Sequence, residues 1–480
     1  MSGDPQRQHY GLTLAVLATG ALAFALLQTM VAPALPAIQR EFGASTTAVT
    51  WVLTIYLLTA SIATPVLGRL GDMFGKERVL VAVLLVLGAG TLVSALSSSL
   101  EVLIAGRAIQ GAGGAIFPLA FGIIRDEFPR ERVGAGIGLI SATFGIGGGA
   151  GLVLAGVIVD NLDYTWIFWL SLVVIAGAVV TTRLFVPASP IKTPAKIDWG
   201  GAALMAAGVS ALLVAVSEGT AWGWTSLPVL GLLVAAAVLL GTWVRYELGV
   251  PQPMVDMRML RQRPVWTTNV TALMVGFGMF GSFLLVPALV QLPPDSGFGF
   301  GATVTQAGLF LLPSSAVMLF AGPGAGWLGA RYGSRLPLLI GIALVMTGFI
   351  QLAVLHDAHW HIYLNSLITG AGIGLSFAAM AALIVDAVPQ SQTGVASGMN
   401  TIMRSIGGAL GAQVAASIVG AHVCAAGFPT EGGFVAAFIV SAGALLLALV
   451  AAFLIPQRAA EAAVPHGHHR LGESVRAAAG

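Results

Sequence analysis

The sequence predicts an all-α polytopic membrane protein with fourteen transmembrane helices, arranged as two six-helix bundles with two further helices inserted between them. Three observations predict this fold class. Hydrophobic residues make up 57% of the 480 residues and charged residues only 9%, whereas soluble domains carry about 25% charged residues. Fourteen apolar stretches are each long enough to cross a bilayer core of about 30 Å, which takes about 20 helical residues. A glycine-rich, charged segment occurs twice, once in each half of the chain.

The apolar stretches follow one another with short polar connections. Many contain glycine or proline, which membrane helices tolerate and which let helices approach closely. No cleavage site follows the first stretch, so we expect it to be a retained span. The stretches lie at residues 12–33, 47–67, 79–96, 101–124, 133–158, 165–186, 200–217, 226–244, 265–290, 304–325, 337–355, 361–387, 393–421 and 433–454.

The repeated segment, Gly68–Arg78, lies between the second and third stretches, and a weaker copy is Gly326–Gly333. Its glycines predict a sharp turn, and its charges keep it out of hydrocarbon. Five positions of the segment match the copy: Gly68, Leu70, Gly71, Phe74 and Gly75 align with Gly326, Leu328, Gly329, Tyr332 and Gly333. The two halves of the chain are therefore predicted to be related.

The repeat and the linkers predict the domain organisation. Residues 1–186 form the first six-helix bundle, and residues 187–264 hold a linker and the two additional helices. Residues 265–456 form the second bundle. The tail, residues 457–480, is polar and rich in small residues, and we expect it to be disordered.

The basic residues predict the orientation. If the N-terminus is cytoplasmic, all Lys and Arg residues fall in cytoplasmic segments except Arg40, Arg107 and Arg404. Such an asymmetry is what the positive-inside rule requires. We therefore expect both termini in the cytoplasm.

Two motifs carry a resemblance to a known family. Gly68–Arg78 resembles the loop between spans two and three of the major facilitator superfamily, and Arg107–Ala115 resembles its RxxQGxGxA motif. Trp51–Leu58 and Ala34–Pro36 resemble the fourteen-span drug:proton antiporter branch of EmrB/QacA type. The resemblance implies the major facilitator fold and a secondary active transporter of the plasma membrane. It also implies export of hydrophobic or amphipathic small molecules by alternating access, linked to a proton gradient without a bound cofactor.

The resemblance implies a cytoplasmic gate at the repeated segment. In the superfamily, the residue that matches Asp72 locks the two halves together, near the start of a span in the second half. A carboxylate at a helix N-terminus is favoured by the helix dipole, and Arg69, Lys76 and Arg78 could surround it with positive charge. The gate residues are then Gly68, Arg69, Gly71, Asp72, Gly75 and Arg78. The alternative is a solvated loop whose basic residues only set the topology.

Two arginines lie inside spans, where a charge costs about 2.5–3.5 kcal/mol on insertion scales. Arg404 lies about 16 Å along its helix from Thr393, and Arg107 lies about 9 Å beyond Glu101. Each is a functional candidate. The alternative is that each arginine ties helices together through carbonyl groups or a buried polar partner.

The substrate is expected in an apolar, aromatic cavity with few polar groups, which suits flat hydrophobic compounds. The residues expected along the substrate and coupling path are Arg107, Gln28, Gln110, Tyr56, Arg404, Asn400, Asn269, Phe280, Glu218 and Asp386.

The sequence differs from the family pattern at residues that the family uses for energy coupling. Members of this branch usually carry an Asp in span one, where this chain has Gln28, and glutamine does not exchange a proton. Gly151–Gly156 also lacks the proline and one glycine of the GPxxGG stretch that antiporters carry. Either the substrate supplies the negative charge that meets the buried arginines, or an end-of-span acid, Glu218 or Asp386, takes that role. We therefore expect a preference for neutral or anionic amphiphiles over cationic dyes. The alternative function is import or export of an anionic metabolite without conventional proton antiport.

The remaining function classes are disfavoured. A net charge of +2 gives no indication of nucleic-acid binding. None of the eight histidines is central in a predicted span, and neither HExxH nor GxSxG occurs. We therefore expect no enzyme and no metal site. The expected partners are a small-molecule substrate and the lipid bilayer, and the protein is expected to be monomeric.

Overall fold

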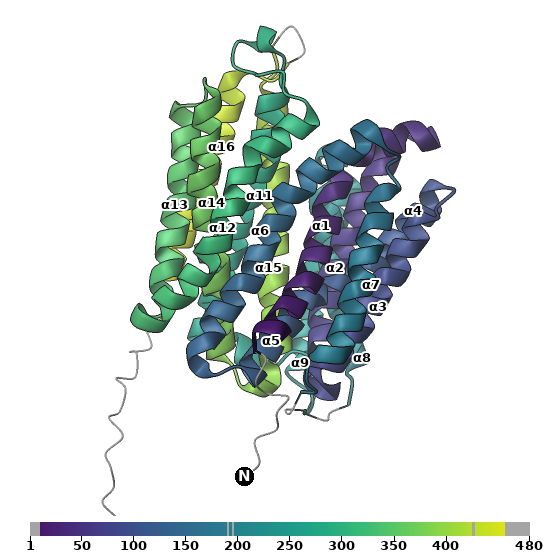
Figure 1. The fold of residues 1–480 in the computed structure, drawn as a ribbon, viewed down its shortest axis with the longest axis vertical. Coiled ribbons are helices and arrows are strands. Elements are labelled where there is room, and N and C mark those ends of the chain that lie inside the picture. The colour runs from purple at the N-terminus through teal and green to yellow at the C-terminus, as the bar shows by residue number, and fades with distance from the viewer. Residues whose placement is uncertain (1–9, 190–191, 194–195, 425–427, 457–480) are drawn as a thin grey trace, which may run out of the picture.

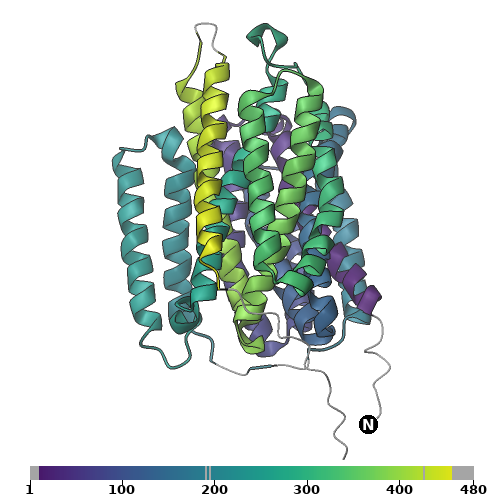
Figure 2. The same cartoon turned by 90° about the vertical axis from the view of Figure 1, so that its left-hand side faces the viewer.

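The structure is a computed structural model that describes residues 10–189, 192–193, 196–424 and 428–456. Fourteen helices in it are long and apolar enough to cross a membrane, as predicted. They run side by side along the long axis of the molecule (Figures 1 and 2). The prediction of an all-α polytopic fold is confirmed.

The first six spans are built from seven helices, because the fourth span is interrupted. It consists of α4, a short 3₁₀ turn (Gly111–Ala115) and α5. A shared apolar core that includes Leu27, Leu84 and Phe168 joins the six spans. The helices are α1 (Tyr10–Phe42), α2 (Thr46–Phe74), α3 (Lys76–Ala95), α4 (Leu100–Gln110), α5 (Ile116–Glu127), α6 (Arg130–Asn161) and α7 (Trp166–Phe185).

The last six spans form a second apolar core, which includes Phe349, Phe438 and Leu445. The inserted pair, α8 (Trp199–Trp222) and α9 (Leu227–Glu247), stands at one side of the molecule (Figure 2). α8 packs against α2 and α15 and thus touches both halves. The remaining helices are α10 (Met257–Leu260), α11 (Arg263–Gln291), α12 (Val304–Tyr332), α13 (Arg335–Val354), α14 (His359–Ala387), α15 (Thr393–Ala421) and α16 (Glu431–Phe453).

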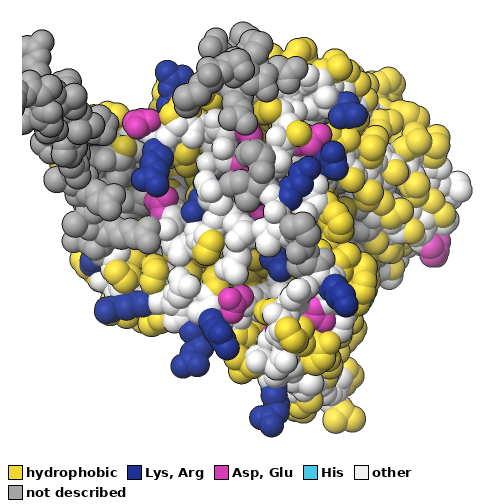
Figure 3. Space-filling model, turned by 90° about the horizontal axis from the view of Figure 1, so that it is seen from below, with side chains coloured by type: hydrophobic (Ala, Val, Ile, Leu, Met, Phe, Trp, Pro, Cys, Tyr) yellow, Lys and Arg dark blue, Asp and Glu magenta, His cyan; other side chains and the backbone are white. Residues whose placement is uncertain are grey.

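Both described ends of the chain lie at the same end of the bundle. Tyr10 packs on Phe128 at the end of α5. At the other terminus, Arg263 and Arg335 donate hydrogen bonds to the carbonyl groups of Leu454 and Phe453. We call this end, where α2 meets α3, the Asp72 end. Figure 3 views it from below, with Lys and Arg side chains spread over the face.

The prediction that the repeated segment is a turn is wrong for most of its length. α2 continues through Gly68 and Gly71 to Phe74, and only Gly75, at φ 106°, breaks the helix. The position of Gly68 requires a glycine, because a Cβ atom there would lie 2.6 Å from the Gly394 carbonyl oxygen. The copy behaves alike, since α12 continues to Tyr332 and the positive-φ residue is Gly333. Gly68 and Gly71 in the segment, and Gly326 in the copy, therefore serve helix packing, which a turn motif does not reveal.

The two halves meet chiefly along two helix pairs, α6 with α12 and α2 with α15. Both contacts bring backbones close together. Gly138 faces Gly322 in the first pair, and Gly68 faces Gly394 in the second. The ribbons of the two halves diverge towards the end opposite Asp72 (Figure 1). The domain boundaries at residues 186, 264 and 456 stay predictions, and the tail (457–480) lies outside the described residues.

Candidate functional site

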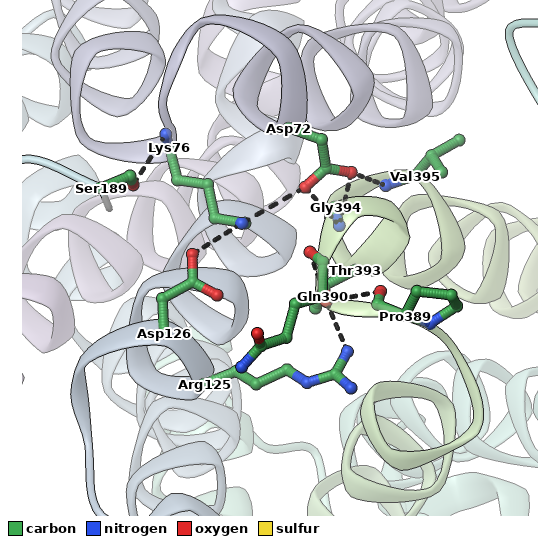
Figure 4. A network of polar contacts seen from close by, with 10 residues as sticks. All are labelled: Asp72, Lys76, Arg125, Asp126, Ser189, Pro389, Gln390, Thr393, Gly394 and Val395. Carbon is green, nitrogen blue, oxygen red and sulfur yellow. Dashed lines mark hydrogen bonds and ion pairs between the residues drawn. The ribbon is translucent and has the colours of Figure 1, made fainter. Parts of the chain in front are cut away.

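Asp72 joins the two halves at one end of the bundle. It lies near the end of α2 with only 1% of its surface exposed. Its carboxylate accepts hydrogen bonds from the backbone N–H of Gly394 (3.0 and 3.2 Å) and of Val395 (3.3 Å), both in the first turn of α15 (Figure 4). The partial positive charge of a helix N-terminus favours a carboxylate there. A side chain of the first half therefore caps a helix of the second half.

Lys76 completes a buried network of charges. Its Nζ lies 3.5 Å from Asp72 Oδ1 and 2.7 Å from Asp126 Oδ2, and the side chains are fully buried. Breaking a buried ion pair leaves an uncompensated charge, which costs about 3–5 kcal/mol. The three side chains therefore depend on one another. Asp126 was missed from the sequence, because its position at a span end gave no indication of a buried partner.

Arg125 forms a second connection between the halves. Its guanidinium, at the end of α5, donates to Thr393 Oγ1 (2.6 Å) and to the Val388 carbonyl (2.7 Å). Figure 4 shows the guanidinium pointing at the start of α15. The sequence placed Arg125 only among the basic residues that set topology.

The linker after α7 also contacts the network. Ser189 Oγ accepts a hydrogen bond from the Lys76 backbone N–H (3.0 Å), and the Thr193 N–H donates to the Asp72 carbonyl (2.9 Å). The sequence indicated only a spacer there. Of the three basic residues expected around Asp72, Lys76 alone forms an ion pair with it. Arg69 and Arg78 form none with any described residue.

A cavity of about 260 Å³ lies between the halves, towards the end opposite Asp72. Its wall is mostly apolar, and three of the residues predicted along the path, Gln28, Tyr56 and Phe280, contribute to it. Gln28 Oε1 is buried without a partner among the described residues. The lining residues are Gln28, Thr29, Ala32, Leu53, Tyr56, Leu57, Phe144, Gly148, Leu152, Phe280, Leu284 and Ala412.

Two smaller cavities continue from it towards the Asp72 end. The nearer one, of about 40 Å³, shares Gln28, Leu57, Phe144 and Phe280 with the large cavity. The deeper one, of about 20 Å³, again contains Phe144. Arg404 lines both smaller cavities. The three cavities thus form a series that narrows towards Arg404, and the polar share of the lining is larger in the two narrow cavities than in the wide one.

Arg107 is fully buried and ties helices together through Nε and Nη1, while its Nη2 has no hydrogen-bond partner among the described residues. Its guanidinium donates to the carbonyls of Val52 (3.1 Å) and Leu27 (3.4 Å) and to Gln110 Oε1 (2.6 Å). The Tyr56 ring lies 3.9 Å from the guanidinium carbon. Gln110 in turn donates to Thr91 and Ser94 of α3. The contacts join α1, α2, α3 and α4 and match the structural alternative for this arginine.

Arg404 has a different environment. Its guanidinium carbon lies 4.4 Å from the centre of the Phe377 ring and 6.0 Å from that of Phe144. It forms no ion pair, and no hydrogen bond involving it is found, among the described residues. One turn away, Asn400 donates to Asn269 Oδ1 (3.0 Å), which joins α15 to α11.

The two acids expected as coupling candidates lie elsewhere. Glu218, on α8, is buried but is not among the residues that line these three cavities. Asp386 lines a separate cavity of about 120 Å³ at the Asp72 end, together with Arg130 and Glu131. The structure therefore does not bring either acid to Arg107 or Arg404.

Comparisons with known proteins place these features in context. A family model described as Major Facilitator Superfamily matches residues 17–412. An uncharacterized MFS-type transporter of Mycobacterium tuberculosis is 32% identical over 85% of this chain, and the match spans only 59% of that longer protein. Multidrug resistance protein Stp of the same species is 30% identical, over 86% of this chain and 76% of that one. The tetracenomycin C resistance and export protein of Streptomyces glaucescens is 27% identical, with the same coverage.

A solved structure is similar to the whole fold. The human organic anion transporter MFSD10 (TETRAN) superposes with a TM-score of 0.67 over 94% of this chain and 100% of that chain. Its sequence identity is 16%, so this likeness concerns the fold alone.

Proposed function

Because the chain belongs to the Major Facilitator Superfamily, whose members are transporters and not enzymes, we propose that it exports hydrophobic or amphipathic small molecules by alternating access. The family prediction is confirmed, as are the fourteen spans, and the protein is a multi-pass membrane transporter of small molecules. The finer assignment, to drug export, draws support from relatives that are named for multidrug resistance or export at 27–30% identity.

The observation that carries the proposal is the cavity between the halves. It is mostly apolar, and at the Asp72 end of the bundle Asp72 joins the two halves by its hydrogen bonds with Gly394 and Val395. Alternating access requires a site at the interface of two bundles that rock against each other. An apolar wall with a few convergent polar groups is suited to amphipathic compounds.

We propose further that the Asp72 end is cytoplasmic and that the protein resides in the plasma membrane as a monomer. The Lys and Arg side chains on that face support this orientation (Figure 3). An extracytoplasmic reporter fused after residue 458 should then be inactive. A strongly active reporter would contradict the proposal that this end of the protein is cytoplasmic.

The coupling ion is proposed to be the proton, although Gln28 lines the cavity where relatives usually carry an Asp. Glu218 and Asp386 remain the candidate acids in this proposal. A second candidate function, transport of an anionic metabolite, is favoured by the cation that Arg404 places at the cavities.

The test is a susceptibility panel of dyes and antibiotics in an efflux-deficient host. Cells that express the protein should tolerate several hydrophobic members of the panel, and cells with an equal amount of the Asp72→Asn variant should not. An unchanged panel, together with accumulation of a nutrient by expressing cells, would overturn the proposal in favour of import.

A further inference from the structure

The geometry points to Arg404 as the anion-binding residue of a subsite that takes the carboxylate of an amphiphilic substrate. This inference rests on the proposed function, because it assumes that the series of cavities holds a small molecule. It names the charge and the shape of that molecule, and it distinguishes the roles of the two arginines that lie within spans.

The first step is the difference in partners between the two arginines. Arg107 is surrounded by two carbonyl groups, the Gln110 side chain and the Tyr56 ring, and none of its surface is exposed. The guanidinium of Arg404 lies over the rings of Phe377 and Phe144, it forms no ion pair or hydrogen bond with a described residue, and it borders two cavities. A cation within a membrane span is costly unless an anion or strong acceptors meet it. Arg404 is therefore accessible to a ligand in these cavities, whereas Arg107, whose Nη2 also lacks a partner among the described residues, lines none of the three.

The second step is independent of Arg404. Ser141 and Ser397 line the same 20 Å³ cavity, and only 3% and 4% of their surfaces are exposed. Neither hydroxyl has a hydrogen-bond partner among the described residues. Buried polar groups are normally satisfied, and each exception needs an explanation. A ligand oxygen would satisfy both hydroxyls.

The two serines come from opposite halves of the molecule. Ser141 lies on α6 of the first half, and Ser397 lies on α15 of the second, two turns before Arg404. A carboxylate has two oxygens and several acceptor positions, so it can accept from a guanidinium and from hydroxyl groups together. Such a ligand would also connect the halves and could thereby affect the equilibrium between the two conformations.

The cavities define the rest of the ligand. The 20 Å³ cavity has room for a group about the size of one water molecule. The 260 Å³ cavity accepts a larger apolar body. Arg404 lines the 20 Å³ cavity and the 40 Å³ cavity that shares residues with the large one, so the matching compound has one anionic group attached to an apolar, preferably aromatic, body.

The charge of the cavity walls disfavours a cationic amphiphile. No Asp or Glu is among the described residues that line the three cavities, and Arg404 is the only formal charge there. A cationic amphiphile would meet a like charge at the narrow end. The planar guanidinium fork also matches a carboxylate in two hydrogen bonds, which a lysine ammonium does not.

The test uses three compounds with one body: pyrenebutyrate (anionic), pyrenebutanol (neutral) and pyrenebutylamine (cationic). Binding to the purified full-length protein is measured by fluorescence in discs of neutral phosphatidylcholine, so that no anionic lipid competes. We expect pyrenebutyrate to bind at least about tenfold tighter than pyrenebutanol, and pyrenebutylamine to bind most weakly. Repeating the titration with phosphatidylglycerol present shows whether an anionic lipid headgroup competes for the same site.

The variants address the residues one at a time. Arg404→Gln should reduce the ratio of the two affinities to about one, and Arg404→Lys should retain part of it. Arg258→Gln, which removes an exposed arginine, should leave the ratio unchanged. If Arg404→Gln does not insert, the conservative variants Ser141→Ala and Ser397→Ala decide, and each should lower the ratio about two- to fivefold.

The subsite would be contradicted if the ratio of pyrenebutyrate affinity to pyrenebutanol affinity were unchanged in Arg404→Gln, or unchanged in both serine variants. Tighter binding of the cationic compound would also contradict it. Transport in proteoliposomes tests the proposed function separately. Export of pyrenebutanol without a preference for pyrenebutyrate would contradict the anion-binding subsite but agree with the proposed export function. An affinity ratio that depends on Arg404, without transport of any of the three compounds, would support the subsite but contradict the export function.

Discussion

The end of α2 and the end of α12 lie at the same end of the molecule and pack in the same way. Each helix continues through its glycines and stops at a positive-φ glycine, Gly75 or Gly333. Each also places a glycine against the first turns of a helix in the other half. Gly68 packs on Gly394 of α15, and Gly326 packs on Gly134 of α6. The repeat has therefore preserved a backbone contact between the halves.

The two regions differ in charge. The first carries Asp72 and Lys76, where the copy has Ala330 and Ser334. Around Asp72 the space is filled by buried, paired side chains, whereas Ala330 and Ser334 border a cavity of about 120 Å³. The close backbone contact is common to both repeats, whereas the Asp72–Lys76 ion pair has no counterpart at the uncharged Ala330 and Ser334. We infer that closure of this end depends on the charges of α2 more than on those of α12.

The largest effect that tests this comparison is expected from Asp72→Asn. The variant removes the negative charge at the start of α15 and leaves the buried Lys76 with Asp126 alone. Because hydrogen bonds to a charged group contribute about 1.5–3 kcal/mol, transport should slow about tenfold or more. Efflux is measured at matched expression, with Asp295→Asn, an exposed acid, as the control. Normal efflux by Asp72→Asn would contradict a gate at Gly68–Arg78 and leave this segment only a role in setting the topology.

An intermediate effect is expected when the two backbone contacts are compared by alanine substitution. A Cβ atom at Gly394 would clash with the Gly68 carbonyl oxygen, whereas a Cβ atom at Gly134, which takes the same place in the second contact, would lie 3.3 Å from Gly326 Cα. Overpacking costs about 1–3 kcal/mol, so Gly394→Ala should slow transport about three- to tenfold. Gly134→Ala should slow it less than about twofold. Equal effects of the two substitutions would show that both contacts are equally tight in the closed state.

The smallest effect concerns the linker that only the first region uses. Ser189 accepts the Lys76 N–H, whereas Ser334 makes no side-chain cap for α13. Loss of a helix cap costs about 1 kcal/mol, so Ser189→Ala should lower the Tm of the purified protein by about 1–2 °C. Ser334→Ala is the matched control and should leave the Tm unchanged. An equal fall in Tm in both variants would show that the two serines stabilise their helices to the same extent.

The sequence by itself determined the fold class and the position of every span. A bilayer core admits only helices of about 20 apolar residues, because each backbone polar group must be satisfied internally. Hydropathy therefore revealed fourteen helices. The motif around Asp72 also pointed to a contact with a helix start of the second half, since a carboxylate is favoured there.

Only the tertiary structure decided which buried charges have partners. Arg107 lies in a recognisable motif and Arg404 does not, but the sequence showed the partners of neither arginine. One is bound by carbonyl groups and the other borders cavities. Asp126 reaches Lys76 from another helix. Such pairings depend on which faces of distant helices meet. Hydropathy is summed along one helix and carries no information about its neighbours, so the partners became visible only in the packed bundle.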